Sequence, residues 1–533
     1  MLDQNRYYIT TAIPYVNAKP HIGFALEIIQ ADTFARYHRL RGDDTYFLTG
    51  TDDNSLTNVL AAEQESIPPR ELVERNARHF LALRDPLDLS FDQFIRTSTD
   101  ARHVAGVQKL WRAVDRKGDI YKQSYQGLYC VRCEQYYTES ELVNGLCPVH
   151  RIPPEIVREE NYFFRLSRYM GQLHSLITSD QLRIIPNARK NEVLSFISQG
   201  LEDFSISRSQ SRARGWGIPV PGDVSQVVYV WFDALANYIT ALGYDSNGSL
   251  FQQYWLHNLH RVHAIGKGIT RFHAVYWPAM LLSADLPLPG TIFVHGYINV
   301  DGVKMSKSLG NVIDPVALVD AYGTDAARYY FLRAVSPTGD ANFTWTQFDA
   351  RYHADLANDL GNLLNRTISM LTRYRGGRIP APSATTDVER SVQQTAARSY
   401  EQVLRSMEGY DPQTALDAIW ELITRVNRYL EERAPWTLAK QARADNVGAD
   451  ERLNTALYTA AEALRVVASL LEPFLPTTAS RMLGQLGAQA ENIWPDCAKW
   501  GGLRPGSPTG QAEPIFPRVE RAEVAAGAAI VVP

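Results

Sequence analysis

Two short segments of the chain carry side chains suited to the chemistry of a nucleotide triphosphate. In the first, residues 14–28 (PYVNAKPHIGFALEI), His21-Ile22-Gly23 follows a loop and opens a predicted helix. Gly23 lets a ligand approach the backbone closely, and the N-terminus of a helix favours anionic oxygen. His21 can donate to a phosphate whose charge changes during displacement. His21 could instead simply cap the helix, so this segment alone leaves both interpretations open.

The second segment is residues 304–311 (KMSKSLGN), a Ser/Gly-containing loop with two ammonium groups. Lys304 and Lys307 are three residues apart, which suits the pyrophosphate side of a triphosphate, where charge passes to the leaving group. A solvated basic loop is the alternative.

A third pattern, Cys130-x2-Cys133-x13-Cys147-x2-His150, contains three of the four cysteines in the chain. Two close pairs of thiolate or imidazole ligands predict a closed tetrahedral Zn²⁺ site with no open position, hence a structural one. Such a site would stabilise a small segment that lacks a core of its own. Unrelated thiols are the alternative.

The elements that must position these residues follow a strand–helix–strand rhythm. Residues 7–16 predict a buried strand, residues 25–42 a helix that ends at Gly42, residues 45–52 a second strand, and a helix begins near Leu56. This order predicts an α/β, doubly wound parallel sheet of the Rossmann-like class. The period of apolar residues then predicts an all-α bundle in the C-terminal part of the chain.

From these patterns we predict six parts of the chain. They are the first half of a nucleotide-binding domain (1–115), a zinc-binding insertion (116–160), the second half of that domain (161–300), a loop region with the KMSKS segment (301–350), a helical domain (351–490) and an irregular tail (491–533).

The composition excludes several classes of protein. The 533 residues suffice for several domains, and 45% hydrophobic with 21% charged residues is ordinary for a globular protein. No stretch is long and apolar enough to span a membrane, and the N-terminal residues do not match a signal peptide, so we expect a cytoplasmic enzyme. The net charge of −4 argues against nonspecific DNA binding but allows a local basic stripe that binds RNA.

The first two segments together are far more specific than either alone. His-Ile-Gly near the N-terminus, with KMSKS after a strand ending in HGY, resembles the paired signatures of class I aminoacyl-tRNA synthetases. The intervening stretches AIPY, FLTGTD, YVWFDAL, IGK and FHAVYWPAML are similar to methionyl-tRNA synthetases, as are NLLNR and NRYLEERAPW further on. The resemblance runs from about residue 7 to 480. It implies ATP-dependent activation of L-methionine, with Mg²⁺ accompanying ATP, and transfer to the 3′ end of tRNA(Met).

The resemblance also implies roles for individual residues. ATP would be bound by His21, Gly23, Gly266, Lys304 and Lys307, of which His21, Lys304 and Lys307 are the catalytic residues. Asp52 would pair with the substrate ammonium, because a desolvated cation needs a carboxylate. Small residues would leave room for the flexible side chain, and aromatic ones would contact the thioether. The whole methionine-binding set is Ala12, Ile13, Tyr15, Asp52, Trp231, Ala234, Leu235, Tyr238, Ile269 and His273. Any one aromatic residue, such as Trp231 or Tyr238, could be ordinary core.

Two further groups of residues follow from the resemblance. Cys130, Cys133, Cys147 and His150 match the single-zinc form of the family's connecting insertion, which is too short here for a separate editing domain. Asn362, Arg366 and Trp436 match positions that contact the CAU anticodon, where unpaired bases stack on Trp and bond to Asn and Arg. Alternatively, Arg366 is a solvated helix residue and Trp436 anchors the start of a helix.

Three positions depart from the family pattern. Phe24 stands where a second histidine is usual, Asp53-Asn54-Ser55 replaces an acid–His–Gly or Ala–His–Gly run, and Gly268 replaces an aspartate. Two other hypotheses therefore stay open. One is a diverged ligase with altered amino acid or tRNA preference, and the other is a catalytically idle tRNA-binding protein. Because the tail contains no clear dimerisation domain, we expect a monomer.

Overall fold

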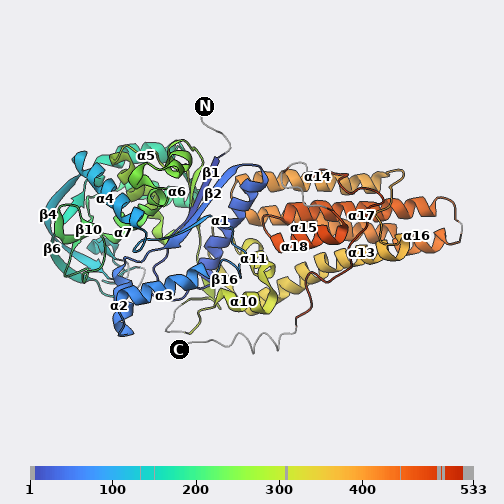
Figure 1. Cartoon of the computed structure of the whole chain (residues 1–533), viewed down its shortest axis with the longest axis horizontal. Helices are drawn as coiled ribbons and strands as arrows, with labels where there is room; N and C mark the ends of the chain where they lie inside the picture. The colour runs from blue at the N-terminus through green and yellow to red at the C-terminus, as the bar shows by residue number, and fades with distance from the viewer. Residues whose placement is uncertain are drawn as a thin grey trace. The chain divides into compact units, whose positions relative to one another are not determined.

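The computed structural model describes residues 6–131, 134–148, 151–305, 310–444, 446–488, 494 and 498–519 (Figure 1). The chain forms two compact units. Unit 1 comprises Met1–Pro20, Asp44–Asp85 and Leu89–His295, and unit 2 comprises His21–Asp43, Pro86–Asp88 and Gly296–Pro533. None of the helices in the described ranges combines the length and apolarity that crossing a bilayer requires.

A six-stranded sheet forms the centre of unit 1. Its strands, in order across the sheet, are β3 (Gln93–Arg96), β2 (Asp44–Thr51), β1 (Arg6–Thr11), β12 (Arg261–Gly266), β13 (Thr291–His295) and β7 (Arg183–Ile185). Every neighbouring pair is parallel. The central strands β1 and β12 are buried along almost their whole length, as expected for apolar runs in a parallel sheet. The sheet confirms the predicted Rossmann-like class.

The strand order reverses between β1 and β12. The chain leaves β1 toward β2 on one side, whereas it leaves β12 toward β13 on the other. The residues that follow these strands lie close together: the Ala12 N–H donates to the Ala264 carbonyl at 3.1 Å, and Tyr15 forms a parallel bridge with Asp52. Ligands of doubly wound proteins bind at this kind of position, at the carboxyl ends of the strands.

Helices and two smaller sheets complete unit 1. The helices are α2 (Leu56–Gln64), α3 (Pro69–Leu81), α4 (Ala101–Arg116), α5 (Met170–Thr178), α6 (Asn187–Ser198), α7 (Val230–Leu235), α8 (Asn237–Thr240) and α9 (Trp277–Ser283). One small sheet has the order β5 (Gln135–Tyr137), β4 (Ile120–Cys130), β6 (Glu155–Phe164) and β8 (Phe204–Ser205). The other has the order β10 (Pro219–Val220), β11 (Asp223–Val228) and β9 (Ser207–Ser209). The predicted zinc insertion thus lies on a sheet whose long β4–β6 pair is antiparallel.

Unit 2 begins with α1 (Ile22–Leu40) and is mostly helical (Figure 1). Its small sheet has the order β15 (Val303–Lys304), β14 (Ile298–Val300) and β16 (Ala341–Phe343). The other helices are α10 (Pro315–Tyr322), α11 (Thr324–Arg333), α12 (Trp345–Arg351), the π-helical η8 (Tyr352–Gly361), α13 (Asn362–Arg375), α14 (Asp387–Glu408), α15 (Pro412–Arg433), α16 (Pro435–Ala442), α17 (Ala449–Leu471) and α18 (Pro476–Leu486). Helices α13, α14 and α15 all pack on the largely buried α17, which confirms the predicted bundle.

Buried polar contacts fix α1 against the rest of unit 2. Arg328 of α11 forms an ion pair with Asp32 of α1 at 2.8 Å, and both side chains are inaccessible to solvent. The same guanidinium donates to the carbonyl groups of Leu87 and Phe474. Loss of one partner of such a buried pair is strongly destabilising. These contacts therefore fix the position of α1, and of His21 at its N-terminus, within unit 2.

The described tail residues 498–519 are tied to the bundle by hydrogen bonds. The fully buried carboxylate of Glu462 accepts from the N–H groups of Gly501 (2.7 Å), Gly502 (3.0 Å) and Leu503 (2.9 Å). The neighbouring Arg465 pairs with the same carboxylate at 2.6 Å. Every backbone donor of this short turn therefore has a charged acceptor.

Candidate active site

The residues predicted to line a methionine pocket lie on several segments of unit 1 that meet near the end of β1. Trp231, Ala234 and Leu235 lie on α7 and Tyr238 on α8, Ile269 ends η5 (Lys267–Ile269), and His273 lies in η6 (Phe272–Tyr276). Leu235 and Tyr238 belong to one buried apolar cluster, and Ala12, Ile13, Trp231 and Ile269 pack against it. The structure therefore brings these six predicted residues to one apolar region.

Aromatic rings form one side of this region. Trp231 stacks on Phe272 with ring centroids 3.7 Å apart and planes 5° from parallel. The His273 ring lies 5.7 Å from that of Tyr238 and 6.5 Å from that of Trp231. The Trp231 Nε1 and the Tyr15 hydroxyl are buried, and neither has a hydrogen-bond partner among the described residues. Buried polar atoms are normally paired, so these two mark a place where a ligand can contribute partners.

The hydrogen bonds of two buried histidines fix their tautomers. Trp277 Nε1 donates to His263 Nε2 at 3.2 Å, so His263 carries its proton on Nδ1, which faces the Thr10 hydroxyl at 2.8 Å. His273 Nδ1 lies 3.0 Å from the Ile269 carbonyl and must donate to it. Burial lowers the pKa of His273 to about 4, so the neutral ring accepts at Nε2 from the Tyr238 hydroxyl at 2.7 Å. At neutral pH the pocket thus contains an uncharged imidazole.

The lowered pKa of His273 predicts a pH dependence of stability. Because the folded pKa lies near 4 and the ordinary value is 6.5, the unfolded chain binds more protons between these pH values. Stability therefore falls as the pH drops from about 6.5 toward 4, by about 2–3 kcal/mol at pH 4.5 from this group alone. His273→Gln cannot titrate at this position. Between pH 7 and 4.5, we therefore expect its free energy of unfolding, measured by urea titration, to fall by about 2–3 kcal/mol less than that of the wild type. Equal pH dependence of the two proteins would contradict this assignment.

Asp52 lies directly after β2, where it forms the bridge with Tyr15, one of the residues predicted to line the methionine pocket. It is 2% exposed, and its Oδ1 accepts from the Asn54 N–H at 3.2 Å and faces the Thr97 hydroxyl at 3.5 Å. Burial, together with the nearby carboxylates of Asp233 and Glu134, raises its pKa well above the ordinary value. Asp52 has no ion-pair partner within the described part of the chain. A buried carboxylate in this state gains most from a cation that a ligand supplies.

The residues after Asp52, where the chain departs from the family pattern, make contacts of their own. Asp53 accepts from the hydroxyls of Thr51 and Ser98 and pairs with Arg96 at 3.0 Å. The Asn54 side-chain amide donates to Asp233 at 2.8 Å.

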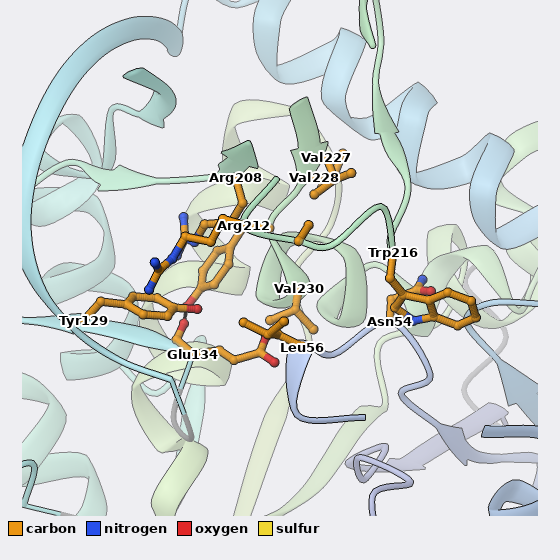
Figure 2. A pocket seen from close by; sticks show the side chains of 12 residues that line it. Asn54, Leu56, Tyr129, Glu134, Arg208, Arg212, Trp216, Val227, Val228 and Val230 are labelled. Carbon is orange, nitrogen blue, oxygen red and sulfur yellow. Dashed lines mark hydrogen bonds between the residues drawn. The ribbon is translucent and has the colours of Figure 1, made fainter. Parts of the chain in front are cut away.

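Ser55 caps α2 and bonds to the carboxyl group of Glu134 at 2.5 Å, and burial raises the pKa of Glu134 to about 7. Glu134 and Asn54 line one pocket (Figure 2), with Asn54 and Trp216 on one side and Tyr129, Arg208 and Arg212 on the other. None of the predicted methionine-binding residues lines this pocket. A side chain from the predicted zinc insertion thus holds the helix that follows Asp52.

In unit 2, His21 lies at the N-cap of α1. Its Nδ1 accepts from the Gly23 N–H at 3.0 Å, so the capping interpretation describes a real contact. Burial lowers the pKa of His21, and the neutral ring therefore carries its proton on Nε2, away from the cap. A Cβ at Gly23 would lie 2.8 Å from His21 Cε1, so glycine is what allows the ring to fold over the start of the helix.

The KMSKS segment begins next to this helix. Met305 Cε lies 3.5 Å from the Cβ position of Gly23, which places the two signature segments side by side within unit 2. Lys304 ends β15, where its ammonium lies 5.9 Å from the centre of the Tyr297 ring. Lys307 lies outside the described residues. Gly266, the other predicted ATP ligand, ends β12 in unit 1.

Half of the predicted zinc ligands can be described. Cys130 at the end of β4 and Cys147 are both fully buried and share a small cluster with Tyr137. Cys133 and His150 lie outside the described residues, and among the rest no group of three or more Cys, His, Asp or Glu is placed to bind a metal. Two buried thiols in a cluster with so little apolar surface fit a soft metal ion such as Zn²⁺.

The predicted anticodon residues lie at two helix starts in unit 2. Asn362 is the exposed first residue of α13, and Arg366, one turn on, pairs with Glu431 at 2.6 Å. Trp436 is 41% exposed near the start of α16. The indole of Trp436 is exposed, and the only charged partner of Arg366 in the described chain is the surface residue Glu431. Both side chains are therefore available to single-stranded RNA.

Sequence reasoning missed four polar residues around Asp52. Asp233 lies inside the quoted YVWFDAL stretch, so its position in a matched motif was an available signal. His103, Thr97 and Glu134 had none, because each reaches the site only through a contact between distant parts of the chain.

Comparisons with known proteins agree with this geometry. A family model described as tRNA synthetases class I (M) matches residues 7–154 and 140–368, and one described as the anticodon binding domain of methionyl tRNA ligase matches residues 379–528. The chain is 43% identical to methionine–tRNA ligase of Brucella melitensis over 526 residues, which are 98% of this chain and 99% of the relative. It is 42% identical to that of Bacillus subtilis, covering 98% of this chain and 79% of the relative. The structure of Mycobacterium tuberculosis methionyl-tRNA synthetase with methionyl-adenylate matches with a TM-score of 0.91 and 41% identity, covering 96% of this chain and 100% of that one.

Proposed function

The chain belongs to the methionyl-tRNA synthetase family, and on this premise we propose how its residues carry out the two reactions of a methionine–tRNA ligase. In the first, the carboxylate of L-methionine attacks the α-phosphorus of ATP. The bond from that phosphorus to the bridging oxygen of pyrophosphate breaks, which gives methionyl-adenylate. In the second, a ribose hydroxyl at the 3′ end of tRNA(Met) attacks the activated carbonyl, and AMP leaves.

The observation that carries the proposal is the buried carboxylate of Asp52, which is bridged to Tyr15 of the predicted methionine set and has no ion-pair partner in the described part of the chain. Asp52 binds the α-ammonium of methionine, which compensates the desolvated charge. Trp231, Tyr238 and His273 line the part of the pocket that takes the thioether, a polarizable group that makes favourable contacts with rings. The unpaired Tyr15 hydroxyl and Trp231 Nε1 gain partners from the bound amino acid.

Positioning and charge stabilisation supply the rate of activation. The neutral imidazole of His21 donates from Nε2 to a phosphate oxygen, since its other nitrogen is occupied by the Gly23 N–H. Lys304 and Lys307 stabilise the charge that develops on the leaving pyrophosphate. Mg²⁺ that arrives with ATP adds positive charge to the phosphates. No residue acts as a covalent nucleophile in this scheme.

The remaining predicted residues have supporting roles. Cys130, Cys133, Cys147 and His150 hold a single structural Zn²⁺, which substitutes for a core in the insertion. Asn362, Arg366 and Trp436 contact the anticodon of tRNA(Met), with Trp436 as the stacking platform.

Aminoacylation of purified tRNAs tests the proposed function. We expect methionine to be attached to initiator and elongator tRNA(Met), and a tRNA with another anticodon to remain uncharged. Attachment of a different amino acid would indicate a diverged ligase. Binding of tRNA(Met) without any charging would indicate an idle tRNA-binding protein and would contradict the proposal.

A further inference from the structure

Three buried polar side chains form a continuous bracket behind the ammonium end of the pocket. The Asp233 carboxylate, 1% exposed, accepts from His103 Nε2 at 2.5 Å and from the Asn54 side-chain amide at 2.8 Å. His103 is itself fully buried, and its Nδ1 faces the Thr240 hydroxyl at 2.7 Å. We call Asn54, His103 and Asp233 the carboxylate bracket.

The bracket joins several of the segments that carry the predicted methionine-binding residues. Asn54 lies two residues after Asp52, and its backbone N–H donates to Asp52 at 3.2 Å. Asp233 lies on α7 between Trp231 and Ala234, whereas Thr240 lies on α8 with Tyr238. Because His103 belongs to α4, the bracket ties the loop after β2 to three helices.

Among the described residues, Asn54 alone donates hydrogen bonds to both carboxylates. It donates through its backbone to Asp52 and through its side chain to Asp233. Those two carboxylates repel each other, and Asp233 is one cause of the unfavourable environment of Asp52. A donor fixed between them holds Asp233 toward His103, so that Asp52 alone is available to a cation. The amide also explains the departure at this position, since an amide N–H, like an imidazole N–H, is a donor for a buried carboxylate.

We propose that the carboxylate bracket is a set of positioning residues that orients Asp52 and α7 for recognition of the α-ammonium of methionine. The inference rests on the proposed role of Asp52. None of the three side chains needs to touch the substrate. Loss of the Asn54 amide leaves one side of Asp233 without its donor and removes the link between α7 and the loop that carries Asp52. We expect about 10–100-fold weaker methionine binding, the range for a hydrogen bond to a charged group.

A ligand without the ammonium separates a positioning role from general loss of structure. The test measures binding of L-methionine and of 4-(methylthio)butanoate, which has the same side chain and carboxylate but no ammonium, to Asn54→Ala by calorimetry or competition. We expect the affinity for methionine to fall about 10–100-fold, with less than a threefold change for the analogue and a KM for ATP within twofold. Asn54→His, which restores a donor, should recover most of the affinity for methionine.

Gln64→Ala is the matched control, because it removes an exposed amide at the end of α2 in the same unit. Equal loss of affinity for both ligands, or no loss for either, would overturn the positioning role. If Asn54→Ala does not fold, Asn54→Asp carries the test, because it keeps the size of the side chain and turns the donor into an acceptor that faces Asp233. Wild-type protein that fails to bind methionine would contradict the proposed function itself, whereas a wild-type binder with an unaffected Asn54 variant would overturn only this inference.

Discussion

Asp52→Asn is expected to lower kcat/KM for methionine in ATP–pyrophosphate exchange by about 10²–10⁴-fold. Removing one partner of a buried ion pair costs about 3–5 kcal/mol, and each 1.4 kcal/mol is a factor of ten. Here the partner that remains is the substrate ammonium, which would have to enter a desolvated site without its counter-charge. Because asparagine has nearly the same shape and can still accept from the Asn54 N–H, the variant tests charge rather than packing.

Asp285→Asn is the matched control for this prediction. Asp285 also pairs with a cation in unit 1, Lys117 at 2.7 Å, but the pair lies at the surface. Surface pairs contribute little, so we expect exchange within twofold of wild type. The assigned role of Asp52 would be wrong if Asp52→Asn retained kcat/KM for methionine within fivefold of wild type.

His21→Asn is expected to lower kcat of exchange by about 10²–10³-fold, the cost of losing one preorganised donor to a reacting oxyanion. The variant also separates the two interpretations of His21. Asparagine is a good N-cap and can accept from the Gly23 N–H as His21 Nδ1 does, but it has no group in place of Nε2. Rate loss with an intact helix start therefore assigns the effect to Nε2.

Measurements of the melting temperature and of the affinity for methionine show whether the His21 variants keep the helix start and the amino acid site intact. We expect His21→Asn to unfold within a few degrees of wild type and to bind methionine with unchanged affinity, since the imidazole acts on the phosphate side. His21→Ala should show the same rate loss and a lower melting temperature, because the cap is also removed. An active His21→Asn beside an impaired His21→Ala would show that capping is the only role of His21.

Much of the fold could be predicted because it depends on local patterns. The apolar run before Pro14, the helical period after Gly23 and the apolar run that ends at Asp52 correspond to β1, α1 and β2. The helical period of apolar residues over α15 and α17 predicted the bundle equally well, and these residues are buried in the structure. The apolar runs of the strands and the helical period of the helices both reflect which faces of each element are buried. The order of apolar residues in a single sequence is enough to show this.

The polar surroundings of Asp52 could not be predicted. His103 and Asp233 are 130 residues apart in the chain, and Asn54 and Asp233 are 179 apart. Nothing in the spacing of a single histidine on α4 indicates that it meets a carboxylate on α7. The capping of α2 by Glu134 is equally non-local, at a separation of 79 residues from Ser55. Contacts of this kind are set by how the helices pack on the sheet.

The structure shows where the residues that depart from the family pattern lie and which contacts they make. Asn54 keeps a donor on Asp233, and Ser55 keeps α2 capped, so this run retains defined roles without the usual histidine and glycine. Phe24 is a buried residue of α1 with 9% exposure, and Gly268 lies within the short η5 turn. The contacts of Asn54 and Ser55 thus compensate for the departure in this run of residues.

The most direct test of the whole scheme is a pre-steady-state measurement of pyrophosphate release in the absence of tRNA. With L-methionine, ATP and Mg²⁺ in excess, we predict a burst of one pyrophosphate per chain as methionyl-adenylate accumulates, no burst without methionine, and a much slower burst from Asp52→Asn and His21→Asn. Two results would contradict the scheme: a folded wild-type protein that releases no pyrophosphate with methionine, or an Asp52→Asn variant that releases it as fast as wild type.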